Sequence, residues 1–89
     1  MRLISEDGLT DLPYERVALE IVETKGEGDF DPDYWEIIAY DTSDNSDDVW
    51  TMAVYFSLKE ARAALLQARF ALQRSCFWFE FGALQKEKN

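Results

Sequence analysis

The spacing of apolar residues changes at Ser57, and this change constrains the fold more than any other feature of the chain. Residues 57–60 read Ser-Leu-Lys-Glu, the spacing of a capping box, in which the serine hydroxyl and the glutamate carboxylate each bind a free amide at a helix start. Apolar side chains then recur on one stripe at helical spacing: Leu58, Ala61, Leu65, Ala68 and Leu72, with Ala64 beside them. We predict a helix from Leu58 to about Arg74 whose small alanines let it lie close to a sheet.

Before this helix, apolar and polar residues alternate in short runs, which predicts β-strands. Residues 2–5 and 9–12 are typical of a hairpin around Gly8, and Pro13 then interrupts the pattern. Three longer strands are predicted, at 16–25, 34–41 and 49–56. We expect them to form an antiparallel meander. In the third of them, the alternation predicts four side chains on one face: Trp50, Met52, Val54 and Phe56.

An aromatic run follows the helix and predicts a last strand over 76–81. Its side chains alternate, with Phe77, Phe79 and Phe81 on one face and Cys76, Trp78 and Glu80 on the other. Such a strand invites aggregation when its edge is uncovered, so we expect it to lie centrally in the sheet or to pair with a second subunit. Cys76 is the single cysteine, which excludes an internal disulfide, and its aromatic neighbours predict a buried thiol.

Chain length and composition favour one folded domain over residues 1–89, with a frayed tail at 83–89. Eighty-nine residues support a single modest core, and a 47% hydrophobic fraction is too high for a disordered acidic chain. The predicted fold is α+β: an antiparallel sheet of about five or six strands with the helix packed across one face. Three Trp, four Tyr and six Phe exceed what such a core needs, so some aromatic rings are expected at an interface.

Charge is divided unequally along the chain, whose net charge is −9. Residues 1–56 carry 15 acidic side chains against three basic ones, whereas residues 57–89 carry three against six. An acidic surface of this kind governs solubility and the choice of partner. The candidate partner-binding residues lie in the two acidic loops: Asp29, Asp31, Asp33, Asp44, Asp47 and Asp48.

Several functional classes are excluded or disfavoured by composition. The chain has no histidine, which removes His-based catalysis and the common zinc and iron ligand sets, and its loop carboxylates are expected to stay solvated. We therefore expect no enzyme, no cofactor and no metal, since neither acidic loop has the calcium-loop pattern of glycine and glutamate. The negative charge disfavours direct nucleic-acid binding. No apolar run approaches a membrane span and no signal peptide is evident, which predicts a cytoplasmic protein without membrane contact.

The first fifteen residues, Met-Arg-Leu-Ile-Ser-Glu-Asp-Gly-Leu-Thr-Asp-Leu-Pro-Tyr-Glu, carry a resemblance. They are similar to the N-terminus of a group of small phage and prophage proteins of low-GC Gram-positive bacteria, which begin Met-Arg-Ile-Ile-Ser-x-Asp-Gly and continue with Asp-x-Pro-Tyr-Glu. Aromatic strands, a Ser/Thr-capped helix and an aromatic final strand extend the likeness more loosely. The resemblance implies a phage-related setting in a bacterial host and assigns no site.

Three functional hypotheses follow. The first is a non-enzymatic binding protein that modulates or inhibits a host protein through its acidic surface. A narrower form of this hypothesis has a host protein that binds nucleic acid, in which the carboxylates stand in for phosphates. The second is a homo-oligomeric sponge for an anionic nucleotide, in which basic and aromatic side chains converge: Arg2, Tyr14, Arg16, Arg62 and Arg69. In the alternative reading, Arg62 and Arg69 pair with carboxylates of the sheet. The third is a structural or assembly accessory of the phage.

A homo-oligomer is also expected from the apolar residues that the predicted core does not use. Leu66 and Phe70 fall outside the helical stripe, which indicates a second contact surface on the helix. Self-association would cover the free edge of the aromatic strand and bury its rings. The predicted interface therefore consists of Leu66, Phe70, Phe77, Trp78 and Phe79.

Overall fold

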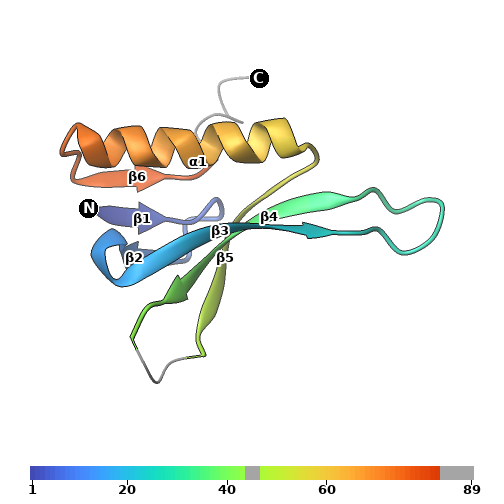
Figure 1. The fold of residues 1–89 in the computed structure, drawn as a ribbon, viewed down its shortest axis with the longest axis horizontal. Coiled ribbons are helices and arrows are strands. Elements are labelled where there is room, and N and C mark those ends of the chain that lie inside the picture. Colours follow the sequence, from blue (N-terminus) through green and yellow to red (C-terminus); the bar gives the residue numbers. More distant parts are fainter. Residues whose placement is uncertain (44–46, 83–89) are drawn as a thin grey trace.

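The computed structural model describes residues 1–43 and 47–82, which contain six strands and one long helix (Figure 1). In chain order these are β1 (Arg2–Ile4), β2 (Asp11–Pro13), a short 3-10 helix (Tyr14–Arg16), β3 (Val17–Thr24), β4 (Tyr34–Asp41), β5 (Val49–Tyr55), α1 (Leu58–Gln73) and β6 (Trp78–Glu80). The α+β class is confirmed. The predicted tail at 83–89 lies outside the described residues.

The strands form two sheets of three strands each, so the prediction of one antiparallel sheet of five or six strands is wrong. The larger sheet is the predicted meander, β3-β4-β5, and all its pairs are antiparallel. In the smaller sheet, β1 pairs with β2 as the predicted hairpin and with β6 in parallel. Pro13 and the 3-10 helix that follows it turn the chain between the two sheets, so the hairpin does not continue into β3.

The turn of the hairpin joins the two sheets at the edge of β5. The Glu6 N–H donates to the Met52 carbonyl at 2.7 Å, and the Val54 N–H donates to Glu6 Oε2 at 3.0 Å. Inside the turn, the buried Ser5 hydroxyl donates to Asp7 Oδ1 and accepts from the Thr10 N–H. The hydrogen bond from Ser5 and a second one from the Leu9 N–H lower the pKa of Asp7.

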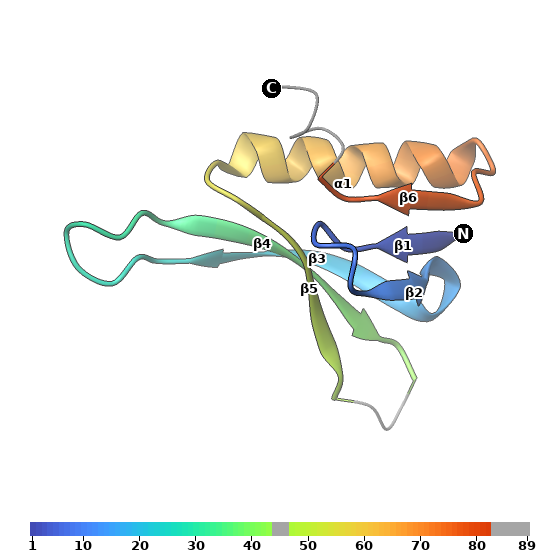
Figure 2. The same ribbon diagram turned by 180° about the vertical axis from the view of Figure 1, so that it is seen from behind.

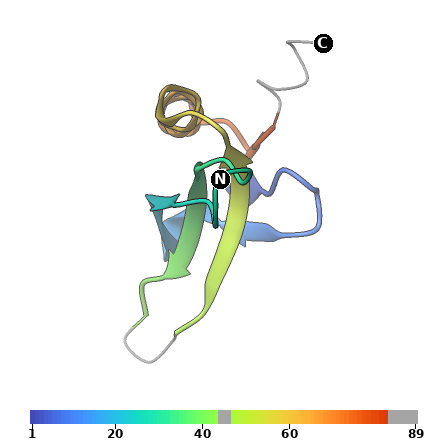
Figure 3. The ribbon, with the colours of Figure 1, turned by 90° about the vertical axis from the view of Figure 1, so that its right-hand side faces the viewer.

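Helix α1 begins as predicted and packs through alanines. Ser57 is the N-cap, and its hydroxyl accepts from the Glu60 N–H at 3.1 Å. The buried core of the described residues is one cluster drawn from both sheets and the helix: Leu3, Ile37, Ala39, Met52, Ala53, Tyr55, Ala61, Ala64, Ala68 and Phe81. Leu65 packs against this cluster, whereas Leu58 and Leu72 at the two ends of the predicted stripe are exposed. Figure 3 views the helix nearly along its axis, beside the meander.

A β-bulge in β5 reverses the side-chain alternation of that strand. Ile37 pairs with Ala53 and Ile38 with Thr51, which leaves Met52 without a partner residue on β4. After the bulge, Ala53 and Tyr55 face the core, while Val54 and Phe56 face the other side and Phe56 is 68% exposed. The prediction that Trp50, Met52, Val54 and Phe56 share one face is therefore wrong, because one inserted residue shifts the phase of everything after it.

Strand β6 is shorter and less buried than the sequence predicts. It lies beside β1, between β1 and α1 in both face views (Figures 1 and 2), and among the described strands it is an edge strand rather than a central one. Phe81 is fully buried and meets the half-buried Phe79 edge-on at 5.1 Å between ring centroids. Phe77 precedes the strand and is 88% exposed, and Cys76 is also exposed, so the predicted buried thiol is wrong.

The helix ends in a Schellman motif whose left-handed residue is a serine. The Cys76 N–H donates to the Ala71 carbonyl and the Ser75 N–H to the Leu72 carbonyl, both at 3.0 Å, and Ser75 has a φ of 58°. A Cβ in this conformation costs about 1–2 kcal/mol, which glycine avoids.

We expect Ser75→Gly to stabilise the domain by about 0.5–1 kcal/mol, less than the whole Cβ cost because glycine also gains freedom in the unfolded chain. This corresponds to a rise of a few degrees in Tm by differential scanning calorimetry. Ser43→Gly, in the exposed β4–β5 loop, is the matched control and should not raise Tm. Equal shifts in both variants would contradict this account of Ser75.

Candidate functional site

One face of the β3-β4-β5 sheet is covered, whereas no described residues form a layer over the other. Side chains alternate along each strand, and the set that includes Ile37, Ala39 and Tyr55 belongs to the core beside α1. The opposite set we call the outer face: Ala18, Glu20, Val22 and Thr24 of β3; Tyr34, Glu36, Ile38 and Tyr40 of β4; Val49, Thr51 and Val54 of β5. Val22 is 36% exposed, Tyr40 37% and Val49 57%, as expected of apolar side chains with no layer packed on them.

The outer face has carboxylates among its apolar side chains. Glu20 lies beside Ile38 across the strand pair, and Glu36 lies between Val22 and Val54. Glu36 Oε2 accepts a hydrogen bond from the Thr51 hydroxyl at 2.9 Å, which fixes that carboxylate over the centre of the face. The outer face can therefore bury apolar surface and at the same time offer acceptors to a cationic partner.

A groove lies at each end of the outer face, because the two connections of a meander fall at opposite ends of its sheet (Figure 1). The groove beside the β3–β4 loop has a volume of about 650 Å³, and its lining includes Glu27, Asp31, Glu36, Tyr34 and Phe56. The groove beside the β4–β5 connection has a volume of about 360 Å³, and its lining includes Glu20, Asp41, Asp47, Asp48 and Tyr40. Both grooves combine carboxylates with aromatic rings, and the larger groove is also lined by Lys25.

Other carboxylates shape the loops next to the grooves. The Gly26 N–H donates to Asp33 Oδ1 at 3.0 Å; this bond, with the nearby Lys25 ammonium, lowers the pKa of Asp33. The Ser43 N–H donates to Asp41 Oδ1 at 2.8 Å and lowers the pKa of Asp41. Lys25 is held by Glu23 and Asp33. Its hydrogen bond to Glu23, and then the charges of the two carboxylates, raise the pKa of Lys25. Asp33 and Asp41 therefore stay ionised at neutral pH.

The six predicted partner-binding residues fall into different environments. Asp31, Asp47 and Asp48 line the grooves, and Asp33 is bound within its own loop. Asp29 is exposed but lines neither groove, and Asp44 lies outside the described residues. Sequence reasoning missed Glu20, Glu27, Glu36 and Asp41. Glu20 and Glu36 alternate with apolar residues inside strands. This pattern is typical of any solvated sheet face, so the sequence alone does not mark these two glutamates as binding residues. They stand out only because the described residues place no second layer over this face.

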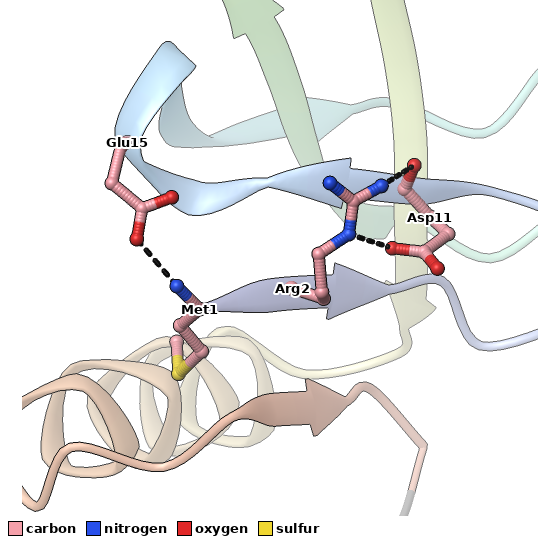
Figure 4. A network of polar contacts seen from close by, with 4 residues as sticks. All are labelled: Met1, Arg2, Asp11 and Glu15. Atoms are coloured by element: carbon pink, nitrogen blue, oxygen red, sulfur yellow. Dashed lines mark hydrogen bonds and ion pairs between the residues drawn. The ribbon is translucent and has the colours of Figure 1, made fainter.

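The residues of the predicted nucleotide site are distributed over the molecule. Arg2 Nε donates to Asp11 Oδ1 at 2.8 Å, and the guanidinium also reaches the Asp11 carbonyl (Figure 4). Tyr14 packs against the core, and Arg16 ends the 3-10 helix. Arg62 and Arg69 are exposed on α1. None of the five lines either groove of the outer face, and the nucleotide site stays a prediction.

Near Arg2, the amino group of Met1 pairs with the Glu15 carboxylate, which lowers the pKa of that carboxylate (Figure 4). Together with the Arg2 contact to Asp11, this pair ties β1 to the segment that leads from β2 into β3. Among the ion pairs between described residues, none joins Arg62 or Arg69 to the sheet, contrary to the alternative reading of these two arginines.

The predicted interface residues are mostly exposed. Leu66 is 47% exposed, Phe70 40%, Phe77 88% and Trp78 59%, whereas Phe79 packs against the core. Leu66 and Phe70 lie one helical turn apart on α1, and Phe77 and Trp78 lie at the start of β6. Exposed apolar side chains thus lie on the helix, at the start of β6 and on the outer face, and also singly at Leu9 and Phe30.

Within residues 1–43 and 47–82, no group of three acidic or thiol side chains is arranged to hold a metal ion. The helix that the structure describes is too short and too polar to cross a membrane. Burial, and secondarily the charge of Glu6, raises the pKa of the Tyr55 hydroxyl to about 12, so this phenol is protonated at neutral pH.

The fold defines a small α+β protein in which one helix and a three-stranded sheet cover the same face of a meander. Comparison of the chain with protein-family models, curated proteins and solved structures finds no match.

Proposed function

We propose that this protein is a non-enzymatic binding protein whose outer face docks on a basic, partly apolar surface of a partner protein. The observation that carries the proposal is the outer face itself. Residues 1–43 and 47–82 place no layer over this sheet face, which has carboxylates among its apolar residues and an acidic groove at each end. Tyr40 and Val49 are paired across β4 and β5 and both are exposed, and exposed apolar side chains that lie together favour a binding face over a purely solubilising one.

The chemistry of the outer face defines the partner. Val22, Ile38 and Val49 supply apolar contact, while the carboxylates select lysine and arginine and accelerate the encounter with a basic surface. In the larger groove, Tyr34 and Phe56 lie among carboxylates, an arrangement that suits one basic side chain stacked on an aromatic ring. The partner surface is thus basic at the positions that meet the grooves and apolar between them.

The setting of this function is proposed from the N-terminal resemblance to phage and prophage proteins. A host protein that binds nucleic acid has the required basic surface, and occupying that surface would modulate or inhibit the host protein in the bacterial cytoplasm. Carboxylates at the two ends of a rigid sheet would then stand in for phosphates of the displaced nucleic acid. This setting requires no catalytic step and no cofactor.

The proposal can be tested without the natural partner by titrating the protein with a peptide of alternating arginine and leucine. Amide chemical shifts in NMR are expected to change along β3, β4 and β5 and not along α1. Glu20→Lys should weaken binding by at least about tenfold because it reverses a charge beside Ile38. Asp29→Lys changes the net charge equally at an exposed position that lines neither groove, so it should have a much smaller effect. Equal losses would show general charge attraction and contradict a specific face.

A further inference from the structure

Helix α1 has two apolar sides, and the described part of the subunit buries only one of them. Ala64 and Ala68 are buried against the sheet. Leu66 and Phe70 come two residues after each of these alanines, which at about 100° per residue places them on nearly the opposite side of the helix. They are 47% and 40% exposed, one turn apart, and in the described part of the chain they lie outside the core cluster. The helix therefore presents a short apolar stripe to solvent.

Basic side chains border this stripe. Arg62 lies one turn before Leu66, and Lys59 and Arg69 lie on the same side of the helix; all three are exposed. None of the ion pairs found between described residues involves them. We call Lys59, Arg62, Leu66, Arg69 and Phe70 the helix stripe. It combines apolar contact with positive charge, in a protein whose net charge is −9.

The outer face is complementary to the helix stripe in both respects. It offers Val22, Ile38 and Val49 for apolar contact, and Glu20, Glu36 and Asp47 as acceptors for the basic side chains. The two surfaces lie on opposite sides of the molecule, since α1 packs on the covered face of the sheet. They cannot meet within one subunit, but two copies of the chain supply one of each.

We propose that the outer face binds the helix stripe of a second copy of this chain. The helix of one subunit then lies on the outer face of the next, so that the meander has a helix on both of its faces. Because the two surfaces differ, the contact is head-to-tail and continues from copy to copy, giving a ring if the rotation closes and a filament if it does not. The same face is then closed to any other partner, so self-association and partner binding compete.

Two variants that each disable one surface test the proposal, and neither depends on a host partner. Leu66→Glu places a carboxylate in the helix stripe, where it faces the carboxylates of the outer face. Val49→Lys places an ammonium on the outer face, at a position that is 57% exposed, where it repels the basic side chains of the helix stripe. In sedimentation velocity, the wild-type protein should form oligomers with rising concentration, and each variant alone should stay monomeric. An equimolar mixture should form a dimer and nothing larger, because only one intact pair of surfaces remains between the two variants.

Leu9→Glu is the matched control, since Leu9 is 86% exposed in the hairpin turn and belongs to neither surface. It should leave self-association unchanged. Phe70→Glu provides a second helix variant if Leu66→Glu does not give the native circular dichroism spectrum.

A monomeric wild-type protein at every concentration, or a mixture that yields no dimer, would overturn the proposal. Oligomers that survive both variants but disappear when Phe77 and Trp78 are replaced with serine would also overturn it in favour of the β6 edge. The peptide titration described above, carried out on the monomeric Leu66→Glu variant whose outer face is intact, reads out partner binding without displacing a second copy, so the two proposals can fail independently.

Discussion

Replacing Phe81 with alanine is expected to lower the free energy of unfolding by about 3–5 kcal/mol. Phe81 is fully buried, and its ring packs edge-on against Phe79 where β6 meets the core. Truncation removes the apolar surface of the ring and leaves a cavity that the short strand cannot close by relaxation. A domain of this size has about 5–15 kcal/mol of stability in total, so a large share would be lost.

Phe77→Ala is the matched control for this variant. Both residues belong to the same alternating aromatic run, but Phe77 is 88% exposed, so its truncation should change stability by no more than about 0.5 kcal/mol. Urea denaturation followed by tryptophan fluorescence measures both. If the two variants lost similar stability, residues 77–81 would not be arranged as the structure shows, and the ring of Phe77 would have to be buried.

The aromatic run also shows where sequence reasoning reaches its limit. Alternation correctly places Phe79 and Phe81 toward the core, but it does not say at which residue a strand begins. Strand β6 begins at Trp78, so the pattern no longer governs Phe77. Alternation likewise carries no information about pairing, and the parallel pair of β1 and β6 joins residues more than 70 positions apart. Helix α1 was predictable because both its cap and its apolar stripe are local features.

The same distinction applies to the candidate site. The acidic loops are evident from composition, and three of their six named residues do line the grooves. The contribution of Glu20 and Glu36 depends on which face of the sheet is uncovered, and that depends on where the helix packs. The bulge at Met52 adds a second obstacle, because it exchanges Val54 and Phe56 with Ala53 and Tyr55 between the two faces. A one-residue insertion of this kind leaves no local signal in the sequence.

Side-chain size links the core to the surfaces proposed for binding. Half of the buried hydrophobic residues in the described part of the chain are alanines: Ala39, Ala53, Ala61, Ala64 and Ala68. Small residues let the helix and the sheet lie close together, but each buries little apolar area. Larger side chains such as Leu66, Phe70, Val49 and Trp78 remain exposed on the helix, the outer face and β6. A core of this composition gives modest stability, so covering the outer face would stabilise the fold as well as form a complex.

Enlarging the alanine contact should therefore destabilise the fold. Ala68 is fully buried between α1 and the sheet, and leucine there would need space that the close approach of the helix does not leave. We expect Ala68→Leu to destabilise by about 1–3 kcal/mol, or to move the helix away from the meander. Ala63→Leu, on the exposed side of the same helix, should be nearly neutral, because leucine and alanine have similar helix propensities.

For a domain of this size, 1 kcal/mol corresponds to about 4–8 °C in Tm, so calorimetry resolves the difference between the two variants. An unchanged Tm for Ala68→Leu would mean that the helix and the sheet are not in close contact there, and the helix stripe would then lose its fixed position relative to the outer face.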